Sequence, residues 1–444
     1  MAARLNQPQG PPAWPLLGHL PAFLHDKLGF LTSCAEQYGD VVPLHIGEPT
    51  YLLNDAASIQ HVLISNSANY SKTWRLTSPR GKRFSGNGLL TSFGAEHLRQ
   101  RRLLQPAFSR NAIEELFFEV MLDRTKRRME TWCIQPGREV DLAAETESLA
   151  LCIILGSIFG LNFADEKLTG AVTLRRRYTE YFYESLLPFP EYLPFPVVQR
   201  YRRAQGLIDE VIRQEIAHPS RSRGFAANFA AATYPDGTRM NFPQQRDEIL
   251  TLMSAGYETI GDALCWTLYL LARQPEVESQ VLRELNEILG DRDPSADDIA
   301  KLSFTRQVLD ESLRLYPPTW IFIRMALGDD TLPCGTHIRR NSKLYLCQYV
   351  THRSAKYFPD PTGFDPARFR PGEAAKRPRF SYFPFGGGSR QCIGEHFALL
   401  EGVTVLALLL RRFRFELCPD QDVAPRPSIT LRPKHGIRAK ILLR

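Results

Sequence analysis

The chain has 444 residues, of which 43% are apolar and 11% aromatic, and its 55 basic and 48 acidic residues give a net charge of +7. This composition supports a large buried core and excludes a disordered chain. The basic residues are spread along the chain without a nucleic-acid-binding module, so the positive charge favours a solvated basic surface over a nucleic-acid partner.

Eight scattered cysteines form no CxxC pair and have no histidine at zinc spacing. In a long chain this pattern predicts reduced thiols in a cytoplasm rather than disulfides. The N-terminal residues hold no apolar run long enough for a signal peptide, and the longest apolar stretch, at 403–410, is too short to cross a bilayer. We therefore expect a cytoplasmic monomer with no integral membrane span.

The predicted elements favour a mainly helical α+β protein with small peripheral sheets. After a proline-rich lead-in at 1–21, the alternating residues of 41–54 predict a hairpin with a Gly-Glu-Pro turn. Apolar periodicity predicts helices at about 95–130, 141–160, 200–217, 246–273, 276–289, 303–315 and 395–412. Short strands are predicted near 321–327, 343–348 and the C-terminal end. No internal repeat divides the chain, and we expect a single domain over residues 1–444.

The segment 178–201 differs from its surroundings, because it combines many aromatic residues with four prolines. It therefore cannot form one continuous helix. It fits a mobile apolar lid or a surface that touches a membrane. An ordinary packed corner between two helices is an equal alternative.

Two polar patterns occur on predicted helices. His97 and Arg101 are four residues apart, so they share a helix face and could bind an anion, although a basic solvent face is the usual outcome. Glu311 and Arg314 also share a face, on a helix that ends before two prolines. Alone, such a pair is a common surface salt bridge that contributes little stability.

A third pattern, Ala-Gly-Tyr-Glu-Thr at 255–259, lies in the middle of an apolar helix. Gly256 and Gly261 weaken that helix, and Thr259 can bond a preceding carbonyl and loosen the turn. An acid beside a hydroxyl in apolar surroundings is typical of proton delivery. A solvated polar pair in a kinked helix is the plainer alternative.

The sequence PFGGGSRQCIG at 384–394 places one cysteine after a run of glycines. It lacks the patterns of phosphate-binding loops. Cys392 comes just before a predicted helix, where backbone N–H groups and the helix dipole favour a thiolate. A buried structural cysteine is the alternative, and it does not explain the residues around it: Phe385, Gly388, Arg390 and Gly394.

Together, in this order and at these separations, the patterns resemble the haem-thiolate monooxygenases, the cytochromes P450, over nearly the whole chain. The family's haem loop, F-x-x-G-x-R-x-C-x-G, is matched without a gap at Phe385, Gly388, Arg390, Cys392 and Gly394. The family's E-x-x-R matches Glu311 and Arg314, its A-G-x-E/D-T matches Ala255, Gly256, Glu258 and Thr259, and its P-x-R-F matches Pro366, Arg368 and Phe369.

The resemblance implies that Cys392 is the axial thiolate of a haem b iron, which favours O–O cleavage. The loop glycines would admit the porphyrin face and direct N–H groups to the sulfur. The implied haem contacts are His97, Arg101, Ala255, Arg324, Phe385, Gly388, Arg390 and Gly394. His97 stands where the family usually has tryptophan, and it can still donate to a propionate.

The resemblance also implies roles away from the iron ligand. Thr259 would hydrogen-bond dioxygen, and Glu258 would help to relay protons. Glu311, Arg314 and Arg368 would form a buried structural network that braces the cysteine loop. Ala367 replaces a glutamate that is common in the family, with little consequence.

Electrons would reach the haem from NAD(P)H through a separate ferredoxin or flavodoxin and its reductase, because no reductase domain follows the haem loop. Arginines at 99, 102 and 110 would suit an acidic partner.

A lipophilic substrate, hydroxylated or epoxidised, would meet the residues near 72–90 and 178–200 and the side chains of Ala255, Thr319, Ile321 and Ile429. Terpenoids, fatty acids, steroids and polyketides remain alternatives for this substrate. Desaturation, oxidative coupling or rearrangement would use the same site. A peroxide-driven enzyme commonly lacks the acid and alcohol of Glu258 and Thr259, and a haem-thiolate sensor or carrier does not need them.

Overall fold

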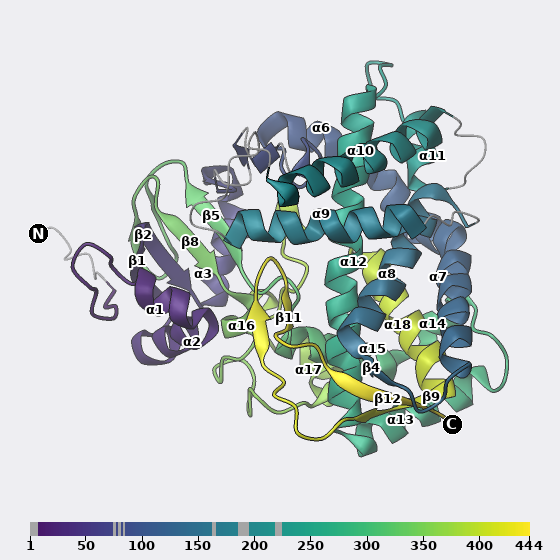
Figure 1. The fold of residues 1–444 in the computed structure, drawn as a ribbon. Coiled ribbons are helices and arrows are strands. Elements are labelled where there is room, and N and C mark those ends of the chain that lie inside the picture. Colours follow the sequence, from purple (N-terminus) through teal and green to yellow (C-terminus); the bar gives the residue numbers. More distant parts are fainter. Residues whose placement is uncertain are drawn as a thin grey trace, which may run out of the picture. The chain divides into compact units, whose positions relative to one another are not determined.

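The computed structural model describes residues 8–73, 77–78, 81–82, 85–161, 166–184, 195–217 and 224–444. The chain divides into two compact units. The sheet unit comprises Met1–Thr77 and Asp310–Cys392, and the helical unit comprises Ser78–Leu309 and Ile393–Arg444. Helices dominate and the strands are short, as the sequence predicts (Figure 1).

The sheet unit contains a five-stranded sheet in the order β1 (Val41–Ile46), β2 (Glu48–Leu53), β8 (Lys343–Leu346), β5 (Phe322–Ala326) and β3 (Tyr70–Ser71). Strands β2 and β8 pair in parallel, and the other neighbours pair antiparallel. The predicted hairpin is confirmed as β1–β2, which turns at Gly47 with a φ of 75°. A second ladder joins β6 (Asp330–Thr331) to β7 (His337–Ile338).

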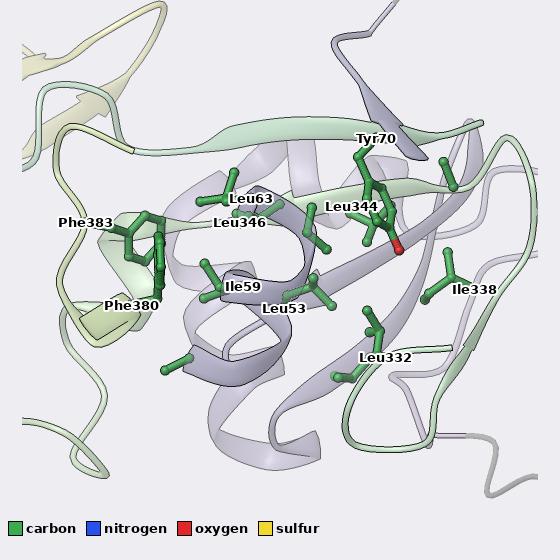
Figure 2. Close-up of a cluster of buried hydrophobic side chains, with 14 of the residues drawn as sticks. Leu53, Ile59, Leu63, Tyr70, Leu332, Ile338, Leu344, Leu346, Phe380 and Phe383 are labelled. Atoms are coloured by element: carbon green, nitrogen blue, oxygen red, sulfur yellow. The ribbon is translucent and has the colours of Figure 1, made fainter. Parts of the chain in front are cut away.

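The sheet unit also contains short helices: α1 (Leu20–His25), α2 (Lys27–Tyr38), α3 (Ala56–Gln60), α16 (Gln348–Thr351) and α17 (Pro371–Ala374). Helix α15 (Ser303–Leu315) enters the unit at Asp310. Ile59 and Leu63, from α3 and the π turn after it, belong to one apolar core with Leu344 of the sheet (Figure 2). Phe380 and Phe383 belong to the same core, so the chain just before the cysteine loop is anchored by apolar burial.

The helical unit is built from α6 (Gly94–Leu104), α7 (Arg110–Cys133), α8 (Leu142–Phe159), α9 (Glu166–Glu184), α10 (Pro196–Ala217), α11 (Phe225–Ala231), α12 (Phe242–Ala272), α13 (Pro275–Leu289), α14 (Ala296–Lys301) and α18 (Glu395–Arg412). Its sheet has the order β4 (Glu139–Asp141), β12 (Arg438–Leu443), β9 (Phe413–Leu417). A separate hairpin joins β10 (Pro425–Pro427) to β11 (Leu431–Pro433).

Helices α8 and α12 pack closely because two glycines remove side chains from their contact. A Cβ atom at Gly256 would lie 2.8 Å from the Ile154 side chain, and one at Gly261 would lie 3.0 Å from Cα of Glu147. The glycines are therefore packing residues, and α12 continues as an α-helix through both. Among the described residues, α8 is the one helix apolar and long enough to cross a membrane, and 67% of it is buried, as in the core helix of a globular protein.

The single helix predicted at about 95–130 is wrong. The structure has α6 and α7 there, separated by a 3-10 turn at Gln105–Phe108. Pro106 lacks the N–H that a continuing helix needs, and the Ser109 hydroxyl accepts a bond from the Ala112 N–H and so caps a new helix.

The aromatic segment at 178–201 is partly described. Its first residues belong to α9, whose bounds end at Glu184, and its last residues belong to α10, whose bounds begin at Pro196. The stretch 185–194, on which the lid and membrane interpretations depend, lies outside the described residues.

The close approach of α8 and α12 predicts opposite effects for two glycine substitutions. Gly256→Ala forces a methyl group into Ile154, and we expect it to lower the free energy of unfolding by about 1–3 kcal/mol. Gly206→Ala, on the exposed face of α10 with open space around the glycine, should raise it by up to about 1 kcal/mol. Urea unfolding of both variants measures this, and equal effects would contradict the packing role of Gly256.

Candidate active site

The cysteine loop owes its glycines to backbone conformation and close packing within the sheet unit. Gly386 and Gly388 have φ values of 73° and 70°, in the left-handed region that favours glycine. A Cβ atom at Gly388 would collide with the backbone carbonyl of Leu63, and one at Gly387 would lie 2.7 Å from the Phe380 ring. The glycine run is therefore required by the loop itself, whatever lies against it.

The loop ends at an accessible thiol. The Cys392 N–H donates to the Phe385 carbonyl at 2.9 Å, which closes the turn just before the cysteine. Cys392 is exposed, and Glu395, the first residue of α18, follows it by three positions. In the sequence, Cys392 follows the predicted haem contacts Phe385 and Arg390 and precedes the predicted contact Gly394. All eight cysteines lie in the described part of the chain, and they are thiols rather than disulfides, as predicted.

A buried histidine and glutamine hold the chain just before the loop. The Phe383 N–H donates to Nε2 of His352 at 2.9 Å, and Nε2 of Gln348 donates to the Phe383 carbonyl at 2.6 Å. Burial, with the charges of Arg314 and Arg353, holds the pKa of His352 well below its ordinary value. His352 is therefore neutral and can accept the Phe383 N–H. The sequence analysis missed both anchors.

The predicted network of Glu311, Arg314 and Arg368 is present and buried. Arg314 donates to both carboxylate oxygens of Glu311, at 2.6 and 2.8 Å, and both side chains are 0% exposed. Arg314 also donates to the carbonyl of His352 at 2.9 Å. Nε of Arg368 lies 3.4 Å from Glu311. The network thus reaches the cysteine loop through His352 and Phe383.

Three cations gather in the sheet unit. Burial lowers the pKa of Lys72 well below its ordinary value, and the charges of Arg390 and Arg324 lower it further. Burial also lowers the pKa of Arg324 to about 10. Like charges held together in this way are stabilised by an anion between them. Lys72 was missed, because a single lysine in a loop carries no spacing signal.

On the helical unit, α12 carries the predicted acid and alcohol. The Thr259 hydroxyl donates to the Ala255 carbonyl at 2.9 Å, as the spacing predicts. Burial raises the pKa of Glu258 to about 7, although the charge of Arg176 opposes this, and Glu147 raises it again. Glu258 can therefore both release and take up a proton near neutral pH.

The other predicted haem contacts divide between the units. His97 and Arg101 lie on α6 of the helical unit, where their spacing gives them one helix face and His97 is buried. Arg324 and Arg390 belong to the sheet unit. The basic residues predicted to contact haem therefore form two sets, one in each unit.

Of the predicted substrate contacts, Ile429 is the one whose surroundings are fixed by several hydrogen bonds. It lies at the tip of the β10–β11 hairpin with 42% of its surface exposed. Beside it, Ser428 donates to Glu180 of α9 at 2.7 Å, and Nε1 of Trp266 on α12 donates to the Leu431 carbonyl at 2.9 Å. Arg432 also pairs with Glu180. The hairpin is therefore held to α9 and α12 on both sides of Ile429.

The remaining predicted substrate contacts are more dispersed. Ala255 is exposed on α12, and Thr319 and Ile321 are half-buried between α15 and β5 of the sheet unit. Several residues of the predicted 72–90 region lie outside the described residues.

The basic residues expected to face an electron donor are partly paired within the helical unit. Arg99 pairs with Asp236 at 3.0 Å, and Arg110 pairs with Glu114 at 2.8 Å. Arg102 is exposed, and no ion pair joins it to another described residue. Exposed pairs are weak, so all three can still attract an acidic surface.

Comparisons with known proteins identify the family. The family model described as Cytochrome P450 matches residues 8–440. Cyclooctatin synthase of Streptomyces melanosporofaciens is 33% identical over 431 residues, which cover 95% of this chain and 92% of that protein. The chain belongs to the cytochrome P450 family.

Further similarities agree with this assignment. Cyclooctat-9-en-7-ol 5-monooxygenase of the same organism is 32% identical, with 92% of this chain and 89% of the relative covered. Pentalenene oxygenase of Streptomyces avermitilis is 28% identical, with 98% and 97% covered. The crystal structure of the cytochrome P450DA haem domain matches with a TM-score of 0.88 at 25% identity, over 99% of this chain and 98% of that one.

These findings confirm the predicted fold and enzyme class. The protein is a cytochrome P450 monooxygenase that oxidises a lipophilic small molecule. It carries haem with a cysteine thiolate ligand and uses dioxygen, with electrons from NAD(P)H supplied through redox partners. A sensor or carrier function has no support among these relatives.

The buried network predicts a large cost for removing one partner. Arg314→Ala leaves the Glu311 carboxylate buried without its guanidinium, and we expect the free energy of unfolding to fall by about 3–5 kcal/mol. Arg213 and Glu210 have the same i,i+3 spacing on an exposed face. Arg213→Ala should therefore cost less than about 1 kcal/mol. Chemical unfolding distinguishes the two, and similar small losses would contradict a stabilising network.

Proposed function

We propose that Cys392 supplies the thiolate ligand to the haem iron, and that Lys72, Arg324 and Arg390 bind the haem propionates. The exposed thiol at the end of a rigid glycine loop and the three gathered cations fit the two ends of such a group. We also propose His97 and Arg101 as propionate contacts from the helical unit. When bound, haem with a thiolate ligand supplies the cleavage of the O–O bond.

Glu258 and Thr259 deliver the protons in this proposal. Releasing one atom of dioxygen as water consumes two protons, which the solvent must supply through the protein. The carboxyl of Glu258, with a pKa of about 7, is partly protonated at neutral pH and can release a proton and take up another. The Thr259 hydroxyl donates to Ala255, so its oxygen remains an acceptor that can exchange a proton with Glu258.

We propose an alicyclic terpenoid, as a hydrocarbon or an alcohol, as the substrate class. Two relatives that cover most of this chain oxygenate, by their names, cyclooctat-9-en-7-ol and pentalenene. The predicted contacts Ala255, Ile321 and Ile429 are apolar and suit a ring hydrocarbon. The anchored hairpin holds Ile429 in place, which favours selection by shape.

We propose a ferredoxin or flavodoxin as the direct electron donor, attracted by exposed arginines of α6 and α7. The cysteine thiols support a reducing cytoplasm. The family model runs through both units without interruption, which supports one haem domain.

Replacing the α12 alcohol should separate electron consumption from product formation. In Thr259→Ala we expect NAD(P)H oxidation to continue while hydrogen peroxide replaces most of the product, because protons no longer reach dioxygen in time. Thr267 makes the same bond to a carbonyl four residues back on α12. Thr267→Ala should therefore stay coupled. The measurement is product and peroxide per NAD(P)H, and unchanged coupling in Thr259→Ala would remove Thr259 from the mechanism.

The electron-donor surface is tested by reversing charge. Arg102→Glu should slow reduction by an acidic ferredoxin severalfold at low ionic strength, with the difference shrinking as salt is added. Arg213→Glu makes the same change in net charge on α10 and should have little effect. Stopped-flow reduction measures both, and an unchanged rate in Arg102→Glu would count against this docking surface.

The substrate class is tested with a panel of ring terpenes, ring terpene alcohols, fatty acids and steroids in the reconstituted enzyme. We expect mass spectrometry to find singly oxygenated products from the terpenes. Oxidation confined to fatty acids would reject the terpenoid proposal while leaving the enzyme class intact.

A further inference from the structure

A polar pocket opens in the helical unit beside α12. Its volume is about 350 Å³, and its walls come from α8, α9, α12 and the chain around β11. Figure 1 shows the β10–β11 hairpin in yellow below α9 and next to α12, where these walls meet. None of the predicted haem or substrate residues lines it.

The lining of the pocket is charged with both signs. Glu147 of α8 pairs with Arg176 of α9 at 3.3 Å, and Asp262 of α12 lies in the same wall. Arg177 and Lys434 are exposed parts of the lining. A cavity of this size with several polar partners is large enough to hold water.

The pocket and Glu258 share the same charged neighbours. The charges that act on Glu258 are those of Arg176 and Glu147, which line the pocket, and that of Glu180 on α9. Asp262 lies four residues after Glu258 and therefore on the same face of α12. The charge of Glu258 also acts on Asp262, so the acid beside Thr259 lies within electrostatic reach of the pocket wall.

Burial shifts the balance of Asp262 toward its protonated form. Burial raises the pKa of Asp262 to about 8, and the negative charges of Glu258 and Glu147 raise this pKa as well. The hydrogen bond with Thr430 of the hairpin and the positive charge of Arg432 lower the pKa. Below pH 8 Asp262 is mostly the neutral acid, which is a proton donor. Above pH 8 it is mostly the carboxylate.

We propose that this pocket is the proton-entry site of the enzyme, with Asp262 as the relay carboxyl between pocket water and Glu258. The proposal rests on the proposed function of Glu258 and Thr259. Glu258 gives its proton toward Thr259, and the resulting carboxylate is stabilised by Arg176. Asp262 then protonates Glu258 through pocket water and takes a new proton from that water. Each round of this relay moves one proton from solvent to Thr259 and changes no oxidation state, so two rounds supply the two protons that one turnover consumes.

The test uses the full-length, haem-loaded enzyme with its electron donor. In Asp262→Asn we expect the peroxide share of NAD(P)H consumption to rise severalfold and the solvent deuterium isotope effect on product formation to increase. Thr173→Val removes a hydroxyl of the pocket wall without touching a carboxyl, and Thr173 already donates to the Thr169 carbonyl. This control should behave like the parent.

Infrared spectroscopy gives a readout that does not depend on turnover. The parent and Thr173→Val should show a protonated carboxyl band that fades as the pH rises through about 8, and Asp262→Asn should lack it. If Asp262→Asn does not fold, Glu147→Gln gives the second readout: the titration of the band should shift to lower pH because a negative neighbour is gone.

Parent-like coupling and isotope effects in the folded Asp262→Asn variant would overturn the proposal, as would the absence of a band that titrates near pH 8. Coupled turnover in Thr259→Ala would instead reject the proposed function, and this proposal with it. Failure confined to the Asp262 variant leaves the proposed function standing.

Discussion

The buried ion pair between Glu311 and Arg314 is the interaction on which the candidate active site of the sheet unit depends. Two fully buried charges are stable only when their remaining hydrogen-bonding groups are satisfied. Arg314 meets this condition by donating to Glu311 and to backbone carbonyls, including that of His352. His352 is kept neutral and holds Phe383, so a charge pair on a helix fixes the start of the loop that presents Cys392. Catalytic geometry here is a consequence of core electrostatics.

Burial is used differently on α12. There it raises the pKa values of Glu258 and Asp262 to about 7 and 8, which places two carboxyls near the pH at which they exchange protons with water. The positive charge of Arg176 keeps the pKa of Glu258 from rising further. In the sheet unit burial acts on cations instead and lowers the pKa of Lys72 and of Arg324, which suits them to an anionic partner. The same physical cause thus prepares one region for proton transfer and the other for binding.

The parts of the site whose residues are close together in the chain could be predicted from the sequence. The cysteine loop, the acid and alcohol of α12, and the i,i+3 pair are all local patterns. Spacing could not show whether Glu311 and Arg314 are exposed, since Glu210 and Arg213 have the same spacing on the surface. Residues that meet only through tertiary packing, such as Lys72, were missed.

The break between α6 and α7 was a different kind of error. Pro106 and Ser109 are sequence signals for this helix break, but the apolar pattern continues across them and favoured a single helix. The mainly helical class was predictable from apolar periodicity, and the cytochrome P450 fold followed from the resemblance of the motifs. The pocket wall was not predictable, because α8, α9, α12 and the hairpin come together only in the folded helical unit.

The most direct test of the account is the absorption spectrum of the dithionite-reduced protein before and after carbon monoxide. A thiolate from Cys392 predicts a strongly red-shifted Soret band that is lost in Cys392→Ala. A band at the position of histidine- or thiol-ligated haem, or a folded protein without haem, would contradict it.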